Sequence, residues 1–588
     1  MDVVPTSAKT TARGQRSQSR ARRARRGVAS STPRPSLPPV GYERAPGASS
    51  APLSGTYRRH EPEKTALYGV VREHLETFLD RARGSEGDGY PHFVEHEFRR
   101  YLDCGLLCHG FARLRCAECG YERLVAFSCK GKLCPSCLAR RAGDTAAWLV
   151  DHLLPEADYR QWVLTFPWTM RFRLAADRRL LTALLRVFLQ TLFAWQRRRG
   201  RRLGITDGHG GAVTFLQRWG GALNLNPHVH SVVPDGLFVR AASGPLTFVP
   251  LPPPTTVEVE ELAVTVARRC TERLVAASGA ESSDYLDPNL AALCEALFWS
   301  RNAPAGTRDI PLLPGLDEAS AEGSGGREEA GLRGKPLCAS VAGFSLHAAQ
   351  VVPAPDREAL ERLCRYGLRA PFSQERLSRR PDGRVVYRLR RPWPNASGAT
   401  HLILDPLDFL RRLAALVSFP GAHQTRRHGV FANRSRLRKL LPPPPPSRYA
   451  EEISPDVAAD VTAVAGESPP AAGAAGMTEP SARPSRPRSS WAQLLRRVLS
   501  VDALSCPRCS SREQSVPMVV LAFLSDPAVV SRILRHLGLP LAAPALAPAR
   551  SSGEARGFEP FAAERSVGDG ECEDDGERGS GPERGPPG

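Results

Sequence analysis

The sequence predicts an α+β protein: an antiparallel sheet flanked by helices, preceded by a small zinc-binding domain and bounded by disordered tails. Strand-like runs at 161–166, 212–219 and 222–233 accompany a strongly amphipathic run at 181–195, an order typical of an antiparallel sheet backed by helices. Seven of the fourteen cysteines fall within 104–137, at spacings typical of metal ligands. These observations predict two distinct parts, a metal-stabilised domain and the sheet that follows it in the sequence.

The length of the chain indicates how many cores it has, and its charge indicates what kind of partner it binds. At 588 residues the chain is too long for one hydrophobic core. Its formal net charge of +19, carried by Arg far more than by Lys, favours a polyanionic partner, and nucleic acid is the commonest one. The sequence has no apolar run of membrane-spanning length and no apolar segment after its basic N-terminus. We therefore expect no membrane contact, a cytoplasmic location and reduced thiols.

Composition divides the chain into six segments. The N-terminal residues are Arg-rich among Ser, Ala, Gly and Pro and cannot bury a core, and later stretches are rich in Pro, Ala and Gly. The expected segments are a disordered basic arm at 1–64, a zinc-binding domain at 65–150, a catalytic domain at 155–441 with a disordered insertion near 303–334, a Pro/Ala-rich linker at 442–488, a small helical segment with a Cys-x-x-Cys motif at 489–545, and a disordered acidic tail at 546–588.

Two cysteine pairs predict structural zinc. The pairs Cys116-x-x-Cys119 and Cys134-x-x-Cys137 each allow a turn that points both thiolates at one ion. The fourteen residues between the pairs are an ordinary spacing for one zinc ion held by both. A closed tetrahedral site has no open position for water, so its expected roles are folding and DNA docking. Further ligands that can complete a second site are Cys104, His109 and Cys129.

Three other cysteines are harder to assign from spacing alone. Cys108 fits either a ligand or a bystander of the zinc sites. The pair Cys506-x-x-Cys509 stands alone in the C-terminal part of the sequence. Because one such pair cannot close a four-coordinate site, two free thiols are at least as good an interpretation as a ligand pair.

The strand at 222–233 carries the first candidate catalytic group. Side chains alternate along a strand, so His228 and His230 lie on one face and Val229 points into whatever covers the other. Two neighbouring imidazoles can bind one divalent ion, although a pair of partly exposed histidines near a hairpin has the same pattern. The turn residues at 234–236 predict a hairpin that returns the chain at 237–239.

The second candidate group lies on a helix predicted from Asp356 to Arg369. On a helical wheel, Tyr366 falls about 110° from the apolar stripe, between the core face and the side bearing Arg362, Arg365 and Arg369. A tyrosine beside guanidinium groups is placed where a phosphate would sit, and these arginines are the expected phosphate contacts. The alternative is a half-buried boundary tyrosine with its hydroxyl in water.

A competing tyrosine follows in the same region. A hairpin is predicted from 384–390 and 400–404, followed by a helix at 406–417. Tyr387 lies in the first of these strands, with arginines nearby. Because it alternates with apolar residues, we expect Tyr387 to pack on a buried strand face rather than to react.

Seven short motifs, in this order, resemble those of the rolling-circle transposases of the bacterial insertion sequence ninety-one family, which belong to the His-hydrophobic-His (HUH) endonucleases. The resemblance covers about 67–441 and 491–540. The motifs are Cys-Gly-Leu-Leu-Cys-His-Gly-Phe-Ala-Arg at 104–113, Phe-Ser-Cys-Lys-Gly-Lys-Leu-Cys-Pro-Ser-Cys at 127–137, Gln-Trp-Val-Leu-Thr-Phe-Pro at 161–167, the histidine strand, Arg-Tyr-Gly-Leu-Arg-Ala-Pro at 365–371, His-Gly-Val-Phe-Ala at 428–432 and Ile-Leu-Arg-His-Leu-Gly-Leu-Pro at 533–540.

This resemblance implies an HUH nuclease-like catalytic domain that nicks and rejoins single-stranded DNA at element ends, near the bacterial nucleoid. It implies that His228 and His230 hold a catalytic Mg²⁺ or Mn²⁺, with Gln217 on the adjacent strand as the candidate third ligand. It also implies that Tyr366 is the nucleophile, which leaves a 5′-phosphotyrosine and a free 3′-hydroxyl. Founding members have a second tyrosine four residues on, where this chain has Ala370, so a single-tyrosine mechanism is implied.

Two alternatives remain at the level of sequence. One is a plasmid replication initiator or relaxase with the same chemistry, although no Gly-x-x-x-x-Gly-Lys-Ser/Thr loop of a helicase motor is present. The other is a zinc-dependent DNA-binding protein whose histidines are structural. Metal-dependent nicking of a single-stranded oligonucleotide distinguishes these classes, and the oligomeric state stays open.

Overall fold

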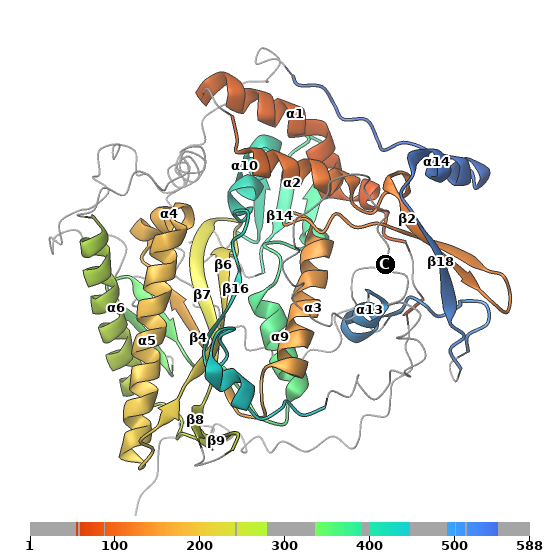
Figure 1. Cartoon of the computed structure of the whole chain (residues 1–588). Helices are drawn as coiled ribbons and strands as arrows, with labels where there is room; N and C mark the ends of the chain where they lie inside the picture. Colours follow the sequence, from red (N-terminus) through yellow and green to blue (C-terminus); the bar gives the residue numbers. More distant parts are fainter. Residues whose placement is uncertain are drawn as a thin grey trace, which may run out of the picture. The chain divides into compact units, whose positions relative to one another are not determined.

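The structure is a computed structural model, and it contains both helices and antiparallel strands, so the predicted α+β class is confirmed (Figure 1). The predicted insertion near 303–334, most of the predicted basic arm and linker, and the tail beyond 550 lie outside the described residues. The described residues are 55–56, 59–86, 89–240, 244–278, 336–390, 399–446, 491–499, 501–511 and 514–550.

A seven-stranded sheet in which every described pairing is antiparallel positions the candidate catalytic residues (Figure 1). The histidine strand, β7, lies between β4 and β6. The strands, in spatial order, are β10 (Cys338–Val341), β11 (Phe344–His347), β4 (Tyr159–Thr165), β7 (Leu225–Pro234), β6 (Gly211–Trp219) and β16 (Thr425–Gly429), with β12 (Val351–Val352) also paired to β4.

One face of this sheet is covered by two long helices, α5 (Arg178–Arg202) and α6 (Thr256–Ser278). Trp162 and Val229 are buried against them, so Val229 points into a covered face, as predicted. Asp177 caps α5 by accepting hydrogen bonds from two backbone N–H groups of its first turn, which satisfies donors that have no partner within the helix.

The opposite face, which bears the histidines, packs against α3 (Pro135–His152) and α9 (Arg357–Gly367). Phe215 of β6 is buried beneath Leu360 and Cys364 of α9. The apolar stripe of α9 therefore faces the sheet, and the last turn of the helix, which carries Tyr366, comes to lie over the histidine strand.

The hairpin predicted at 234–236 was wrong. After β7 the chain bends at Asp235 and continues as β8 (Gly236–Arg240), which pairs with β5 (Gly208–His209) and β9 (Leu246–Pro250) in a separate sheet. The Asp235 carboxylate receives two hydrogen bonds from the Arg160 guanidinium, of 3.0 and 2.6 Å. This buried ion pair stabilises a bend, and the local turn residues could not distinguish a bend from a reversal.

The N-terminal cysteine-rich region and the C-terminal segment build one sheet between them. Strands β2 (Phe111–Cys116) and β3 (Glu122–Ala126) form a hairpin, and β18 (Met518–Leu524) adds to the free side of β2. The segment at 489–545, predicted to be helical, thus supplies one strand to this sheet and contains a second short strand as well as its two helices, α13 (Trp491–Leu499) and α14 (Pro527–His536).

A third core lies under α1 (Ala66–Glu86), α2 (His92–Asp103) and α10 (Pro406–Leu416). The strands of the hairpin predicted from 384–390 and 400–404 are present and pair antiparallel. Among the described helices, none is long and apolar enough to cross a bilayer. The remaining described elements are β1 (Gly55–Thr56), η1 (Pro62–Lys64), η2 (Leu107–His109), α4 (Trp168–Ala176), η5 (Gln374–Arg376), β13 (Leu377–Arg379), β14 (Val385–Arg388), β15 (His401–Leu404), η6 (Arg436–Leu440) and β17 (Val501–Asp502).

Candidate active site and metal centres

Strand pairing brings the three predicted catalytic metal ligands to one face of the sheet. The rings of His228 and His230 lie 4.9 Å apart between centroids, inclined at 65°. In the register of β6 with β7, Gln217 stands directly opposite His228. Because residues opposite one another across two antiparallel strands share a face, Gln217 is placed beside the two imidazoles, on the strand that the sequence predicted.

Two atoms of this group are buried and lack a hydrogen-bond partner: His230 Nε2 and Gln217 Oε1. The Gln217 amide nitrogen is used, because it donates to the Tyr366 and Gly367 carbonyls at 3.1 and 3.2 Å. His228 Nδ1 lies 2.8 Å from the Asn226 carbonyl, which holds the proton on Nδ1 and so places the ring's lone pair on Nε2. Imidazole nitrogen and amide oxygen are suitable donors for a divalent cation, so the residues present fit one.

A glutamine that sequence reasoning missed orients His230. The Gln161 amide nitrogen of β4 lies 2.8 Å from His230 Nδ1. An amide rotated by 180° presents its oxygen at the same place, where it accepts the Nδ1–H and leaves Nε2 for a cation. The signal in the sequence was a single amide among the mostly apolar residues of that strand. Burial, with His228, Arg369 and His347 nearby, holds the pKa of His230 well below its usual range, so the ring is neutral.

Tyr366 lies against the histidine pair. Its ring meets that of His230 edge to face, with centroids 5.7 Å apart and planes at 85°. The Arg369 guanidinium carbon lies 4.2 Å from the Tyr366 ring centroid. Tyr366 is half-buried, whereas Tyr387 is only 3% exposed and burial raises the pKa of its hydroxyl. The expectation that Tyr387 packs on a buried strand face is confirmed.

The three arginines predicted to contact phosphate differ in their surroundings. Arg369 lies beside Tyr366. Arg362 is exposed and lies 3.8 Å from the Glu358 carboxylate, one turn earlier on α9. Arg365 is half-buried in the last turn of the same helix. Of the three, Arg369 is the one whose guanidinium lies over the tyrosine ring.

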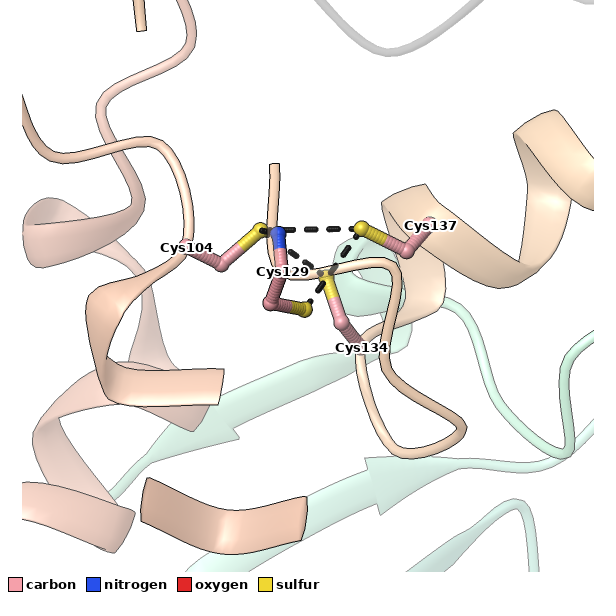
Figure 2. A group of neighbouring side chains, drawn as sticks. All are labelled: Cys104, Cys129, Cys134 and Cys137. Atoms are coloured by element: carbon pink, nitrogen blue, oxygen red, sulfur yellow. Dashed lines mark hydrogen bonds between the residues drawn. The ribbon is translucent and has the colours of Figure 1, made fainter. Parts of the chain in front are cut away.

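Figure 2 shows a cluster of four cysteine side chains between the end of α2 and the start of α3. The sulfur atom of Cys104 lies 3.7 Å from that of Cys134 and 3.6 Å from that of Cys137, and the Cys129 and Cys137 sulfurs are 3.5 Å apart. A zinc ion with Zn–S bonds of about 2.3 Å separates tetrahedral sulfurs by about 3.8 Å. These four thiols therefore have the spacing of one zinc site.

This arrangement corrects the predicted pairing of the two Cys-x-x-Cys motifs. Cys134 and Cys137 join Cys104 and Cys129, and not the other pair. His109, predicted as a zinc ligand, lies outside both cysteine groups found in the described residues; its Nε2 is 3.2 Å from an Asp103 carboxylate oxygen. Sequence spacing tells which thiols are close neighbours, but it does not tell which two pairs meet. Cys116 and Cys119 instead meet Cys506 and Cys509.

Two family models match this chain. Residues 211–438 match a family described as "Putative transposase", and residues 70–166 match the "Transposase zinc-binding domain". The chain resembles the transposases of the insertion sequence ninety-one family. The first match contains Gln217, both histidines and Tyr366; the second contains the four cysteines of Figure 2 and the Cys116 pair, but not Cys506.

Two transposases illustrate the resemblance. The chain is 31% identical over 141 residues to the transposase for insertion sequence element IS801 of Pseudomonas savastanoi pv. phaseolicola, a stretch that spans 24% of this chain and 32% of that protein. It is 26% identical over 333 residues to the putative transposase y4qJ of Sinorhizobium fredii, across 55% of this chain and 71% of the relative. No solved structure is significantly similar to the chain.

Proposed function

We propose that this protein is a transposase of the HUH nuclease type that nicks and rejoins single-stranded DNA at element ends through a covalent bond to Tyr366. The observation that carries the proposal is the meeting of His228, His230 and Gln217 with Tyr366. The Gln217 amide hydrogen-bonds the backbone of Tyr366 itself, although 149 residues separate the two. Both matched families and both relatives are transposases by description, which supports the same class of activity.

Residues of the sheet would hold the catalytic cation as neutral ligands. His228, His230 and Gln217 would hold Mg²⁺ or Mn²⁺, and a bound ion of this kind supplies Lewis-acid polarisation of the scissile phosphate. The Asn226 carbonyl fixes the tautomer of His228 through Nδ1, and Gln161 would do the same for His230 with its amide oxygen turned towards Nδ1. Such outer partners orient the ligand rings and raise their basicity.

Tyr366 supplies the nucleophilic oxygen. A tyrosine hydroxyl ordinarily titrates near pH 10, so it needs nearby positive charge to react at neutral pH. The Arg369 guanidinium lies over the tyrosine ring, where it can pair with a phosphate oxygen and offset developing negative charge. In the step, the tyrosine oxygen bonds to phosphorus and the bond from phosphorus to the 3′-oxygen breaks. The proton lost by tyrosine balances the one gained by the leaving 3′-oxygen.

The reverse reaction explains rejoining without a nucleotide cofactor. Attack by a 3′-hydroxyl on the phosphotyrosine restores a phosphodiester and frees the tyrosine, because the covalent intermediate conserves the bond energy. Arg362 and Arg365 share α9 with Tyr366, Arg369 follows the end of that helix, and these three arginines are the proposed phosphate contacts. The formal net charge of +19 supports binding to DNA, and the cytoplasm is the compartment in which reduced thiols would retain zinc.

Covalent capture of DNA tests this function. Purified protein is incubated with Mn²⁺ and a labelled single-stranded oligonucleotide bearing an element end, then denatured, digested and examined by mass spectrometry. The expected adduct lies on Tyr366 and disappears in Tyr366→Phe, which removes one oxygen and keeps the ring. His230→Ala is expected to lose the adduct while retaining most DNA affinity, because arginines make the phosphate contacts. An adduct on Tyr387, or full activity in EDTA, would contradict the mechanism.

A further inference from the structure

Four cysteines from two distant parts of the sequence meet beside the β2–β3 hairpin. The sulfur atoms of Cys116 and Cys509 lie 3.9 Å apart, and those of Cys119 and Cys506 lie 3.6 Å apart. All four ligand atoms fall within 4.8 Å of one another, and none of the four is in a disulfide. Disulfide sulfurs lie about 2 Å apart, whereas sulfurs on one tetrahedral zinc lie about 3.8 Å apart. The observed spacing is that of thiolates around one ion.

The backbones of the two Cys-x-x-Cys turns match one another. The N–H of Gly120 donates to the Cys116 carbonyl at 3.1 Å, and the N–H of Ser510 donates to the Cys506 carbonyl at 3.0 Å. In both turns the first cysteine is followed four residues later by the donor. Gly120 has a φ of +70°, a conformation that suits glycine and lets the first turn close tightly. The two turns are thus equivalent halves of a four-thiolate site.

Other contacts bring these halves together. β18 pairs antiparallel with β2, with Met518 opposite Cys116, so the strand that follows the second cysteine pair runs beside the strand that ends at the first. The buried Arg123 side chain of β3 donates to the Ala503 carbonyl at 2.7 Å. The Arg508 guanidinium carbon lies 5.0 Å from the Tyr121 ring centroid, across the same interface.

We propose that Cys116, Cys119, Cys506 and Cys509 bind a second structural Zn²⁺, which fastens the C-terminal segment to the zinc-binding domain. This site is distinct from the one in Figure 2 and replaces the interpretation of Cys506 and Cys509 as free thiols. The apolar cluster at the interface is small, so metal binding is expected to supply much of the free energy that holds the two parts together. Its buried members are Ala112, Leu114, Cys116, Cys506, Val516 and Met518.

The same C-terminal segment also contacts the helix that carries Tyr366. Arg497 of α13 donates to the Asp151 carboxylate of α3 at 3.0 Å and to the Glu361 carboxylate of α9 at 2.9 Å. The second zinc site therefore anchors one side of a segment whose other side contacts the candidate catalytic helix. This consequence relies on the proposed function, but the metal site itself does not.

The number of zinc ions per chain tests the proposal directly. Full-length protein purified without added chelator is expected to contain two zinc ions per chain by elemental analysis. Cys506→Ser with Cys509→Ser is expected to leave one, and Cys134→Ser is expected to leave the other. Cys108→Ser is the matched control, because Cys108 is in the same region but in neither group, and it is expected to keep two. One zinc in the wild-type chain, or two in the double variant, would overturn the proposal.

A second measurement uses the wild-type chain and does not depend on how the variants fold. Cys119 is exposed and Cys509 is half-buried, so a thiol-alkylating reagent can reach both unless metal protects them. With zinc bound, both are expected to react slowly, and a chelator is expected to accelerate both at least about tenfold. Cys270, buried in α6, serves as the internal control for unfolding. Equal reaction rates at Cys119 and Cys509 with and without chelator would contradict the site.

Discussion

At the scale of the residue, the two ends of the Gln217 side-chain amide have different surroundings. Its nitrogen donates to two carbonyls at the end of α9, and its oxygen is buried without a hydrogen-bond partner. A glutamine suits this position because its planar amide offers an N–H donor and a neutral oxygen acceptor from one group. The residue thus couples the tyrosine helix to the candidate cation site.

Replacing Gln217 by Ala is expected to weaken metal activation. The variant loses one ligand oxygen and the hydrogen bonds that orient α9, so the Mn²⁺ concentration for half-maximal cleavage should rise by more than the roughly 10- to 100-fold typical of losing an outer partner of a ligand. The measurement is cleavage of a single-stranded oligonucleotide over a range of Mn²⁺ concentrations. Gln161→Ala, which removes only a partner of His230, should give a smaller rise. An unchanged Mn²⁺ dependence in the Gln217 variant would exclude it as a ligand.

The surroundings of His428 lower the pKa of its imidazole. Burial, with a smaller contribution from Arg426, lowers the pKa of His428 from 6.5 to about 4. Between these values the unfolded chain binds a proton at this position that the folded chain does not. The contribution of His428 to stability is therefore complete above pH 6.5 and falls as the pH drops to 4, by about 3 kcal/mol.

Denaturant unfolding at several pH values checks this dependence. The free energy of unfolding of the wild-type chain should fall more steeply between pH 6.5 and 4 than that of His428→Gln, which has no group that titrates there. Parallel pH profiles for the two proteins would show that His428 is protonated equally in the folded and unfolded states.

At the scale of the element, the position of α9 depends on the absence of a side chain at Gly367. A Cβ atom built there would lie 2.4 Å from Cδ2 of Phe215, below any normal contact distance. Phe215 is fully buried in β6, so it has little room to move. The close approach of helix and sheet at this point brings the neighbouring Tyr366 against His230.

Gly367→Ala is expected to displace the end of α9, although alanine is the better helix former. A shift of about 1 Å between nucleophile and phosphate can lower the cleavage rate about 100-fold. DNA affinity should change little, because the arginines remain. Single-turnover cleavage and DNA-binding titrations measure the two effects separately. Adding Phe215→Leu, which creates space, should restore part of the rate; no recovery would argue against a steric cause.

At the scale of the whole molecule, Arg497 joins three parts of the chain that are far apart in sequence. Arg497 lies on α13, and its guanidinium donates hydrogen bonds to the carboxylates of Asp151 on α3 and Glu361 on α9. The Glu361 side chain is only 10% exposed in this contact. A buried carboxylate without its partner is costly, because desolvation of the charge is then uncompensated.

Arg497→Met is therefore expected to destabilise the chain by about 3 kcal/mol. Adding Glu361→Leu removes the more buried of the two carboxylates left without a partner, so the double variant should recover part of that loss. Equilibrium unfolding followed by circular dichroism provides the free energies. If the double variant is less stable than the single one, the ion pair would be contributing through some interaction other than charge compensation.

Local patterns in the sequence determined much of this protein. Alternation placed His228 and His230 on one strand face, and helical periodicity placed Tyr366 at the edge of the apolar stripe of α9. Each Cys-x-x-Cys pair was recognisable because two residues suffice to turn both thiols the same way. These properties depend on interactions between residues a few positions apart, so they are readable without the fold.

The tertiary structure alone decided which of these local features meet. Cys116 and Cys119 meet Cys506 and Cys509 because β18 pairs with β2, although the two strands are far apart in the sequence. The bend at Asp235 depends on Arg160, and the orientation of His230 depends on Gln161, which lie in another strand. A local pattern fixes the direction of a side chain but carries no information about its distant partner. That partner is chosen by sheet register and by the burial of charged and polar groups.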